Sequence, residues 1–171
     1  MRINIPIQDV TDYTILVLYN RGIPVSPLKL QKILYYIQAW HMVYFGRQNM
    51  IFDEKPEAWI NGPVYRSVFD FFKTKFGIYD NIIPSINIDI SEAYYKLGID
   101  EDQSNFLEFI FHNYGTMDDG KLVFLTHSEK PWSEKREGLT PFEYSEEKIS
   151  LDTMYDYYHK RLESNRTKNG Q

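Results

Sequence analysis

Residues 26–46 read SPLKLQKILYYIQAWHMVYFG and predict a long, buried helix. Ser26 followed by Pro27 is a helix start signal, because a serine side chain caps free backbone N–H groups and proline suits the first helical position. Apolar and aromatic side chains then cover most of the helix surface, and Gly46 is a typical helix end. A helix that is apolar nearly all round lies inside its domain. We therefore expect this segment to be the central helix of the protein.

Helical patterns also occur on both sides of this segment. Asp9 and Gly22 can begin and end a first helix, although the β-branched residues between them are also compatible with a strand. Asn61-Gly62-Pro63 reads as a turn from which another helix starts and runs to residue 76. Residues 58–60 are expected to be extended, and residues 78–90 to form a loop with extended parts. Three more helices are expected: one ending at Gly115, one opened by a capping box at Thr116-Met117-Asp118-Asp119 with Asp in place of Glu, and one capped by Ser150.

Together these patterns predict a mainly α fold. About six to seven helices around a central buried helix, with minor extended segments, give a single compact domain over residues 1–163. Residues 164–171 are polar and lack an apolar anchor, so we expect them to form a flexible tail.

Composition excludes several classes of protein. The chain has 171 residues, with 19 Lys and Arg against 24 Asp and Glu and a formal net charge of −5, which does not favour nonspecific binding of nucleic acid. It contains no cysteine, so disulfides, Cys-ligated zinc and thiol nucleophiles are excluded. No apolar run is long enough for a membrane helix, and residues 1–9 lack the features of a signal peptide. We expect a cytoplasmic protein with no membrane partner.

The motifs of common catalytic and cofactor sites are missing from the sequence. It contains no phosphate-binding glycine loop, no GxSxG and no HExxH pattern. The acidic pairs at 101–102 and 118–119 are interpreted as helix starts, where carboxylates favour the positive end of the helix dipole. The four histidines form no i, i+4 pair: they are His41, His112, His127 and His159. We therefore predict no catalytic set, no metal site and no cofactor.

His127 has two interpretations in the segment Thr126-His127-Ser128-Glu129-Lys130-Pro131-Trp132. It can be a general base or a polar contact in a groove walled by Trp132. It can also be a helix-ending histidine that bonds a free carbonyl while Trp132 packs in the core. We favour the second interpretation, because nothing in the sequence pairs His127 with a nucleophile.

Lys29 and Lys32 form a basic stripe on the central helix beside Tyr36. Basic residues next to aromatic ones can contact nucleic acid. Four cations between residues 21 and 52 are a thin basis for such a site, so we interpret the stripe as a solvated edge and do not favour a nucleic-acid partner.

Four elements in chain order resemble the Panacea, or SocA-like, antitoxin domain, a family that includes phage-associated proteins. Residues 28–41 resemble its LKLQKLLYYAQGWHL signature, and Glu57-Ala58-Trp59 its EAW element. Residues 62–73 resemble GPVxxxVYxxFK, and residues 126–132 resemble LTHxxxPW. The resemblance covers roughly residues 10–160. One departure is Tyr65, since the tyrosine of the family comes a few residues later, where this chain has Phe69.

This resemblance implies a non-enzymatic antitoxin that binds its cognate toxin directly. Such toxins are encoded by neighbouring genes, and one branch of the family delivers its toxin to a protease as an adaptor. A phage or prophage protein that binds a host defence component is an alternative of the same kind. A small hydrolase or nucleic-acid-processing enzyme that uses His127 is an alternative of a different class. Neither the residues nor the resemblance specifies an oligomeric state.

We expect the second and third family elements to meet the fourth, because both segments carry polar groups that a simple core does not need. The expected contact is either a partner-binding surface or a purely architectural joint to the central helix. It comprises seven residues: Trp59, Pro63, Tyr65, Arg66, Thr126, His127 and Trp132.

Overall fold

Helix α2 (Pro27–Phe45) is the central helix of the structure, a computed structural model that describes residues 1–84 and 89–169. Every side chain from Leu28 to Met42 is buried. The Ser26 hydroxyl accepts a hydrogen bond from the backbone N–H of Lys29 at 3.0 Å, and the helix ends at Gly46. The predicted central helix is therefore confirmed, together with its N-terminal cap.

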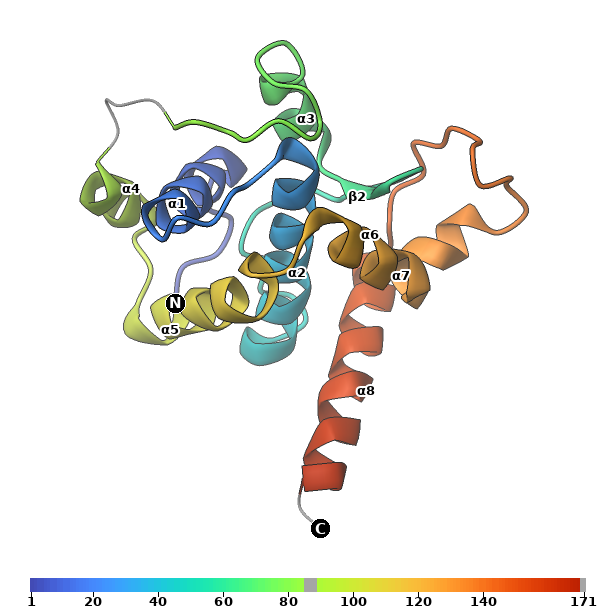
Figure 1. Ribbon diagram of the computed structural model, residues 1–171. Coiled ribbons are helices and arrows are strands. Elements are labelled where there is room, and N and C mark those ends of the chain that lie inside the picture. The colour runs from blue at the N-terminus through green and yellow to red at the C-terminus, as the bar shows by residue number, and fades with distance from the viewer. Residues whose placement is uncertain (85–88, 170–171) are drawn as a thin grey trace.

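Seven further α-helices surround α2 within the described residues, so the predicted mainly α fold is confirmed (Figure 1). One group, α1, α4 and α5, lies on one side of α2, and α6, α7 and α8 lie on the other. In chain order the elements are α1 (Ile7–Asn20), α3 (Arg66–Phe72), α4 (Ile90–Leu97), α5 (Glu101–Ile110), a π-helical turn (Phe111–Gly115), α6 (Asp119–Ser128), α7 (Lys130–Ser133), a 3₁₀ turn (Glu134–Arg136) and α8 (Leu151–Asn169).

A short hairpin connects α2 to α3. Strand β1 (Glu57–Trp59) pairs antiparallel with β2 (Gly62–Val64), which confirms the extended segment expected at 58–60. Gly62 has φ of 101°, and a Cβ there would lie 2.6 Å from Lys32 Cε and 2.8 Å from Thr126 Oγ1. Only glycine therefore lets the hairpin approach both α2 and α6 so closely.

The expected helix start at 61–63 is wrong. Gly62–Val64 is a strand, and α3 begins only at Arg66 and ends at Phe72. The reason is tertiary: the Gln31 side chain accepts a hydrogen bond from Tyr65 N at 2.8 Å and donates one to Tyr65 O at 3.2 Å. This double contact holds the backbone extended where the local sequence favours a helix.

Helix α4 is missing from the sequence-based prediction, which assigned no helix between residues 77 and 106. It is capped by Asp89, whose side chain accepts a hydrogen bond from the backbone N–H of Ser91. It buries only Ala93 and Leu97, a weak pattern that becomes a helix by packing against α1. Residues 85–88, within the expected extended stretch, lie outside the described residues.

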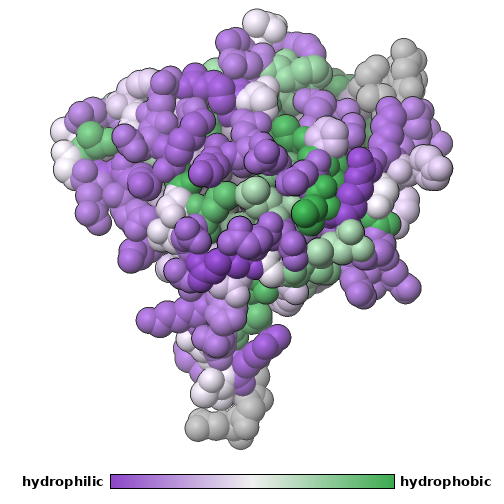
Figure 2. All heavy atoms as spheres, turned by 180° about the vertical axis from the view of Figure 1, so that it is seen from behind, coloured by the Kyte–Doolittle hydropathy of each residue, from purple (hydrophilic) through white to green (hydrophobic). Residues whose placement is uncertain are grey.

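Helices α1 and α8 differ from their expected bounds. The first begins at Ile7 after Pro6, so Asp9 lies in its first turn rather than at its cap. The last continues through Asn169, so residues 164–169 of the expected polar tail are helical. Its C-terminal end projects from the body and carries mostly hydrophilic side chains (Figures 1 and 2). Across the described ranges, no helix has both the length and the apolarity that a membrane span requires.

Candidate partner-binding site

The family elements expected to meet lie side by side. The indole Nε1 of Trp132, in α7, donates a hydrogen bond to the backbone carbonyl of Trp59, in β1, at 2.8 Å. Thr126, in α6, contacts the other strand of the hairpin at Gly62. All seven expected site residues therefore belong to one region, in which the hairpin joins α6 and α7.

Three of the seven residues lie inside this joint rather than at its surface. Pro63, Tyr65 and Thr126 are buried. The carbonyl of Pro63 accepts a hydrogen bond from Lys32 Nζ at 3.1 Å, and Gln31 holds the backbone of Tyr65. These three residues connect the hairpin to α2, which is the architectural role considered above.

The basic stripe on α2 is not solvated, so that expectation is wrong. Lys29 is 4% exposed and Lys32 is completely buried. Burial lowers the pKa of Lys32 to about 7, although the charge of Asp119 acts in the opposite direction. The long apolar stem of a lysine allows this burial, and the Pro63 carbonyl accepts a hydrogen bond from its Nζ. The stripe therefore offers no surface to nucleic acid.

His127 packs flat against Trp132. The ring centroids are 3.9 Å apart and the planes differ by 5°. Burial lowers the pKa of His127, the charge of Lys32 lowers it further, and a hydrogen bond with the Ile60 backbone acts in the opposite direction. The buried Nε2 atom has no hydrogen-bond partner among the described residues. This geometry agrees with the interpretation in which His127 and Trp132 are packed against each other.

Trp59 and Arg66 are half-buried and form a cation–aromatic pair at the edge of the region. The Arg66 guanidinium lies 4.7 Å from the centre of the Trp59 ring. It donates to Glu57 Oε2 at 2.9 Å, to the Tyr144 hydroxyl at 3.2 Å, and to Glu146. These contacts fix the cation over the indole face, which is a favourable cation–π geometry.

Glu57 is the buried centre of this charged cluster, and the sequence analysis assigned it no role. Its carboxylate accepts hydrogen bonds from Trp59 Nε1 at 2.7 Å, Arg66 at 2.9 Å and Lys148 Nζ at 2.8 Å. Burial acts to raise the pKa of Glu57, but the three donors outweigh burial and hold the pKa below its usual range. The carboxylate therefore stays ionised and holds the surrounding side chains in place.

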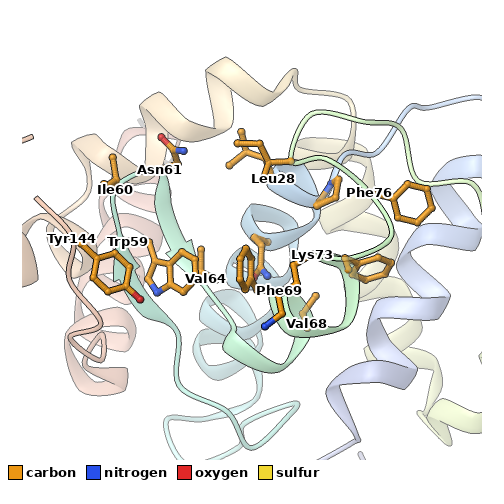
Figure 3. Close-up of a pocket in the computed structure, with 14 residues that line it drawn as sticks. Leu28, Trp59, Ile60, Asn61, Val64, Val68, Phe69, Lys73, Phe76 and Tyr144 are labelled. Carbon is orange, nitrogen blue, oxygen red and sulfur yellow. The ribbon is translucent and has the colours of Figure 1, made fainter. Parts of the chain in front are cut away.

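An apolar groove opens beside the Trp59–Arg66 pair, with a volume of about 300 Å³. We call it the first groove. Trp59 and Tyr144 lie at one end and Phe76 at the other (Figure 3). The Phe69 ring packs edge-on against Trp59, with centroids 4.7 Å apart. The main apolar lining is Leu28, Trp59, Val64, Phe69, Phe76 and Tyr144.

Only Trp59 among the seven expected residues lines this groove. From the sequence, residues 67–76 were expected to lie within one helix, with no part in a binding site. A usable signal was present, because residues 68–76 carry aromatic side chains at four positions, more than one face of a short helix can bury. The shortness of α3 leaves Phe69 and Phe76 half-exposed at the groove.

The family comparison covers most of these elements. The family model described as antitoxin SocA-like, Panacea domain, matches residues 30–133, which is more than half of the chain. The chain belongs to this family. Membership supports an antitoxin-like role and a partner protein. No curated protein and no solved structure matches the chain.

The family stretch also contains a buried carboxylate that the sequence analysis missed. Glu129, 2% exposed, lies at the start of α7. It accepts hydrogen bonds from the Tyr36 hydroxyl at 3.0 Å, from Arg161 at 2.9 Å and from the Tyr158 hydroxyl. Burial raises the pKa of Glu129, while these donors act to lower it. In this SocA-like domain Glu129 joins α2 to α8.

The described residues contain no group of three or more His, Asp or Glu side chains placed to hold a metal ion. Glu57 and Glu129 are both engaged by donors from their own chain. The surface of this region is an apolar groove bordered by a charged and aromatic cluster.

Proposed function

We propose that this chain is an antitoxin that neutralises one protein toxin, encoded by a neighbouring gene, by binding it directly in the cytoplasm. The toxin contacts the first groove and the Trp59–Arg66 pair at its end. The observation that carries the proposal is the position of this groove, most of whose lining belongs to the family-matched stretch.

The chemistry of the groove supports a protein partner. Its lining is apolar and aromatic, and tryptophan and arginine are enriched among residues that dominate binding energy. Arg66 is already held over Trp59 by Glu57, Tyr144 and Glu146. Little side-chain freedom is therefore lost when a partner covers this pair.

We propose binding rather than catalysis as the activity. His127, the residue on which the enzymatic alternative depends, lies flat against Trp132 at 3.9 Å. Its buried Nε2 leaves no open ring edge at that atom for a substrate proton. Membership of the SocA-like family also supports binding rather than catalysis.

Co-expression with the product of the adjacent gene tests the proposal. Growth is scored for each protein alone and for both together, and the chain is purified through a tag. We expect a toxic neighbour whose toxicity disappears in the presence of the chain, together with a stable complex. A harmless neighbour that does not co-purify would contradict the proposal.

The same co-expression experiment distinguishes blocking of the toxin from delivery of the toxin to a protease. If the chain blocks the toxin, the toxin level stays constant and the two proteins co-purify. If the chain acts as an adaptor, the toxin level falls when the chain is expressed and recovers in protease-deficient cells. We expect the first outcome, because the proposal assigns neutralisation to direct contact.

A further inference from the structure

A second apolar groove adjoins the first on the other side of α3. It has a volume of about 470 Å³ and lies between α1, α3 and residues 82–84. Phe72 and Phe76 line both grooves and form the ridge between them. Each volume can receive a large apolar side chain, so the two grooves offer neighbouring pockets separated by one aromatic ridge.

Exposed apolar side chains border both grooves. Phe71 is 43% exposed, Ile78 is 42% exposed and Ile83 is 68% exposed. Lys75 Nζ lies 3.4 Å from the centre of the Phe71 ring, so its stem covers part of this apolar area in the free protein. We call the two grooves with these bordering residues the α3 surface. An apolar area of this kind is typical of an interaction site.

Within the described residues, the hairpin beside the α3 surface offers no free strand edge to an extended peptide. On one side β1 pairs with β2, and on the other Ala58 N donates to Glu147 O at 2.8 Å. The outer edge of β2 is used by side chains of α2, since Lys32 bonds the Pro63 carbonyl and Gln31 bonds Tyr65. A partner segment must therefore satisfy its own backbone hydrogen bonds, as a helix does.

The charges around the first groove are paired within the chain. Lys73 Nζ lies 2.6 Å from Asp70 Oδ1, and Arg66 is paired with two glutamates. A charged side chain entering the first groove would therefore lose water without gaining an unpaired counter-charge. The lining of the second groove includes Asp12 and Lys75 but is mostly apolar, so an uncharged side chain suits both grooves.

We propose that the α3 surface binds one amphipathic helix of the toxin. Two bulky, uncharged side chains one turn apart enter the two grooves and straddle the Phe72–Phe76 ridge. This inference rests on the proposed function and adds to it the kind of segment that is recognised. Residues three or four apart in a regular helix lie next to each other on one face, so they can supply two such side chains without any change in the helix backbone.

Two substitutions with a matched control test the surface by titration calorimetry with the purified toxin. Phe71→Ser and Ile78→Ser each remove a bordering side chain that is more than 40% exposed, so the fold should be retained, and thermal melting checks that it is. We expect each to weaken binding at least tenfold. Phe109→Ser is the control, since Phe109 is 44% exposed on α5, away from both grooves, and should change the affinity less than twofold.

Photo-crosslinking from positions 71 and 78 identifies the bound segment. The expected products link both positions to one toxin helix, at residues three or four apart on its apolar face. A stable, neutralising complex whose crosslinks from 71 and 78 reach another copy of the chain, or no toxin residue, would overturn this inference and leave the proposed function intact. Absence of any complex, with a non-toxic neighbour, would overturn both.

Discussion

The indole Nε1–H of Trp132 donates a hydrogen bond to the backbone carbonyl oxygen of Trp59, which lies 2.8 Å from Nε1 and 73 residues earlier in the chain. This hydrogen bond joins α7 to the hairpin while the Trp132 ring packs on His127. It explains why two separate family elements each end in a tryptophan: one tryptophan faces the first groove and the other fixes its position.

Replacing Trp132 by phenylalanine should therefore destabilise the protein. Trp132→Phe keeps an aromatic ring against His127 but removes the donor to Trp59 O, and loss of one such hydrogen bond costs about 1 kcal/mol. Urea unfolding measures the change. Tyr95→Phe, at a side chain that is 85% exposed on α4, should change the free energy of unfolding by less than about 0.5 kcal/mol. Equal stabilities of the two variants would contradict a structural role for this bond.

His127→Phe separates packing from catalysis. A phenyl ring can keep the stacked contact with Trp132, but it can neither accept nor donate a proton. We expect full neutralisation of the toxin and a stable complex in the growth and pull-down assays. Loss of neutralisation in a folded His127→Phe protein would instead favour the enzymatic alternative.

Lys32 should make stability depend on pH. Its pKa is 10.5 in the unfolded chain and about 7 in the folded protein, because burial disfavours the charged amine. Between these values unfolding takes up a proton, so the free energy of unfolding rises with pH by about 1.4 kcal/mol per unit. This destabilisation is complete below pH 7 and decreases as the pH rises towards 10.5.

Lys32→Met tests that contribution by urea unfolding from pH 7.5 to 9.5. The methionine side chain fills similar space without a charge, so the slope of stability against pH should fall by about 1.4 kcal/mol per unit. Near pH 7 we expect a gain of about 1–3 kcal/mol, as found when buried charges are replaced by apolar groups. An unchanged slope would mean that Lys32 does not titrate in this range.

Glu129→Gln should loosen the attachment of α8. The variant keeps the shape of the side chain but loses the charge that accepts hydrogen bonds from Tyr36, Tyr158 and Arg161. Hydrogen bonds to a buried charge contribute about 1.5–3 kcal/mol each, so we expect a loss of about 2–3 kcal/mol in urea unfolding. Glu163→Gln, further along α8 and exposed, is the control and should have little effect.

Arg66→Gln should release the segment that forms one wall of the first groove. The guanidinium connects Glu57 in the hairpin to Tyr144 and Glu146 in that segment. Hydrogen exchange should become faster for amides of residues 142–148 and stay unchanged in α2. Arg21→Gln, which breaks an exposed ion pair with Glu108 on the other side of the molecule, should leave both regions unchanged.

The sequence-based prediction is confirmed where a helix start depends only on residues that are close in sequence. Ser26 caps α2 as expected because its hydroxyl needs only the N–H of Lys29, three residues away. At α6 the helix is where it was expected but its cap differs, since Asp118 rather than Thr116 accepts the hydrogen bond from Lys121 N. The prediction fails between residues 61 and 66, because Gln31, more than 30 residues away in sequence, holds Tyr65 extended.

The same distinction applies to the candidate site: local motifs identify part of it, and tertiary packing decides the rest. The family elements identify the hairpin and the 126–132 segment, and Trp59 does line the groove. Phe69 and Phe76 were expected in a helix and were not included in the site, because an apolar residue has the same pattern whether a neighbour covers it or not. Their half-exposure follows from the short length of α3, which the sequence does not specify.

By itself the sequence determined the central helix, the mainly α class and the family, because each depends on residue spacing along one short segment or on a few such segments in order. Only the tertiary structure decided that Lys32 is buried, that Glu129 gathers three donors and that two grooves flank α3. A lysine and a carboxylate are stable inside only where distant segments supply the Pro63 carbonyl or the Tyr158 and Arg161 donors. Those partners come from 29 to 32 residues away along the chain, so packing alone places them.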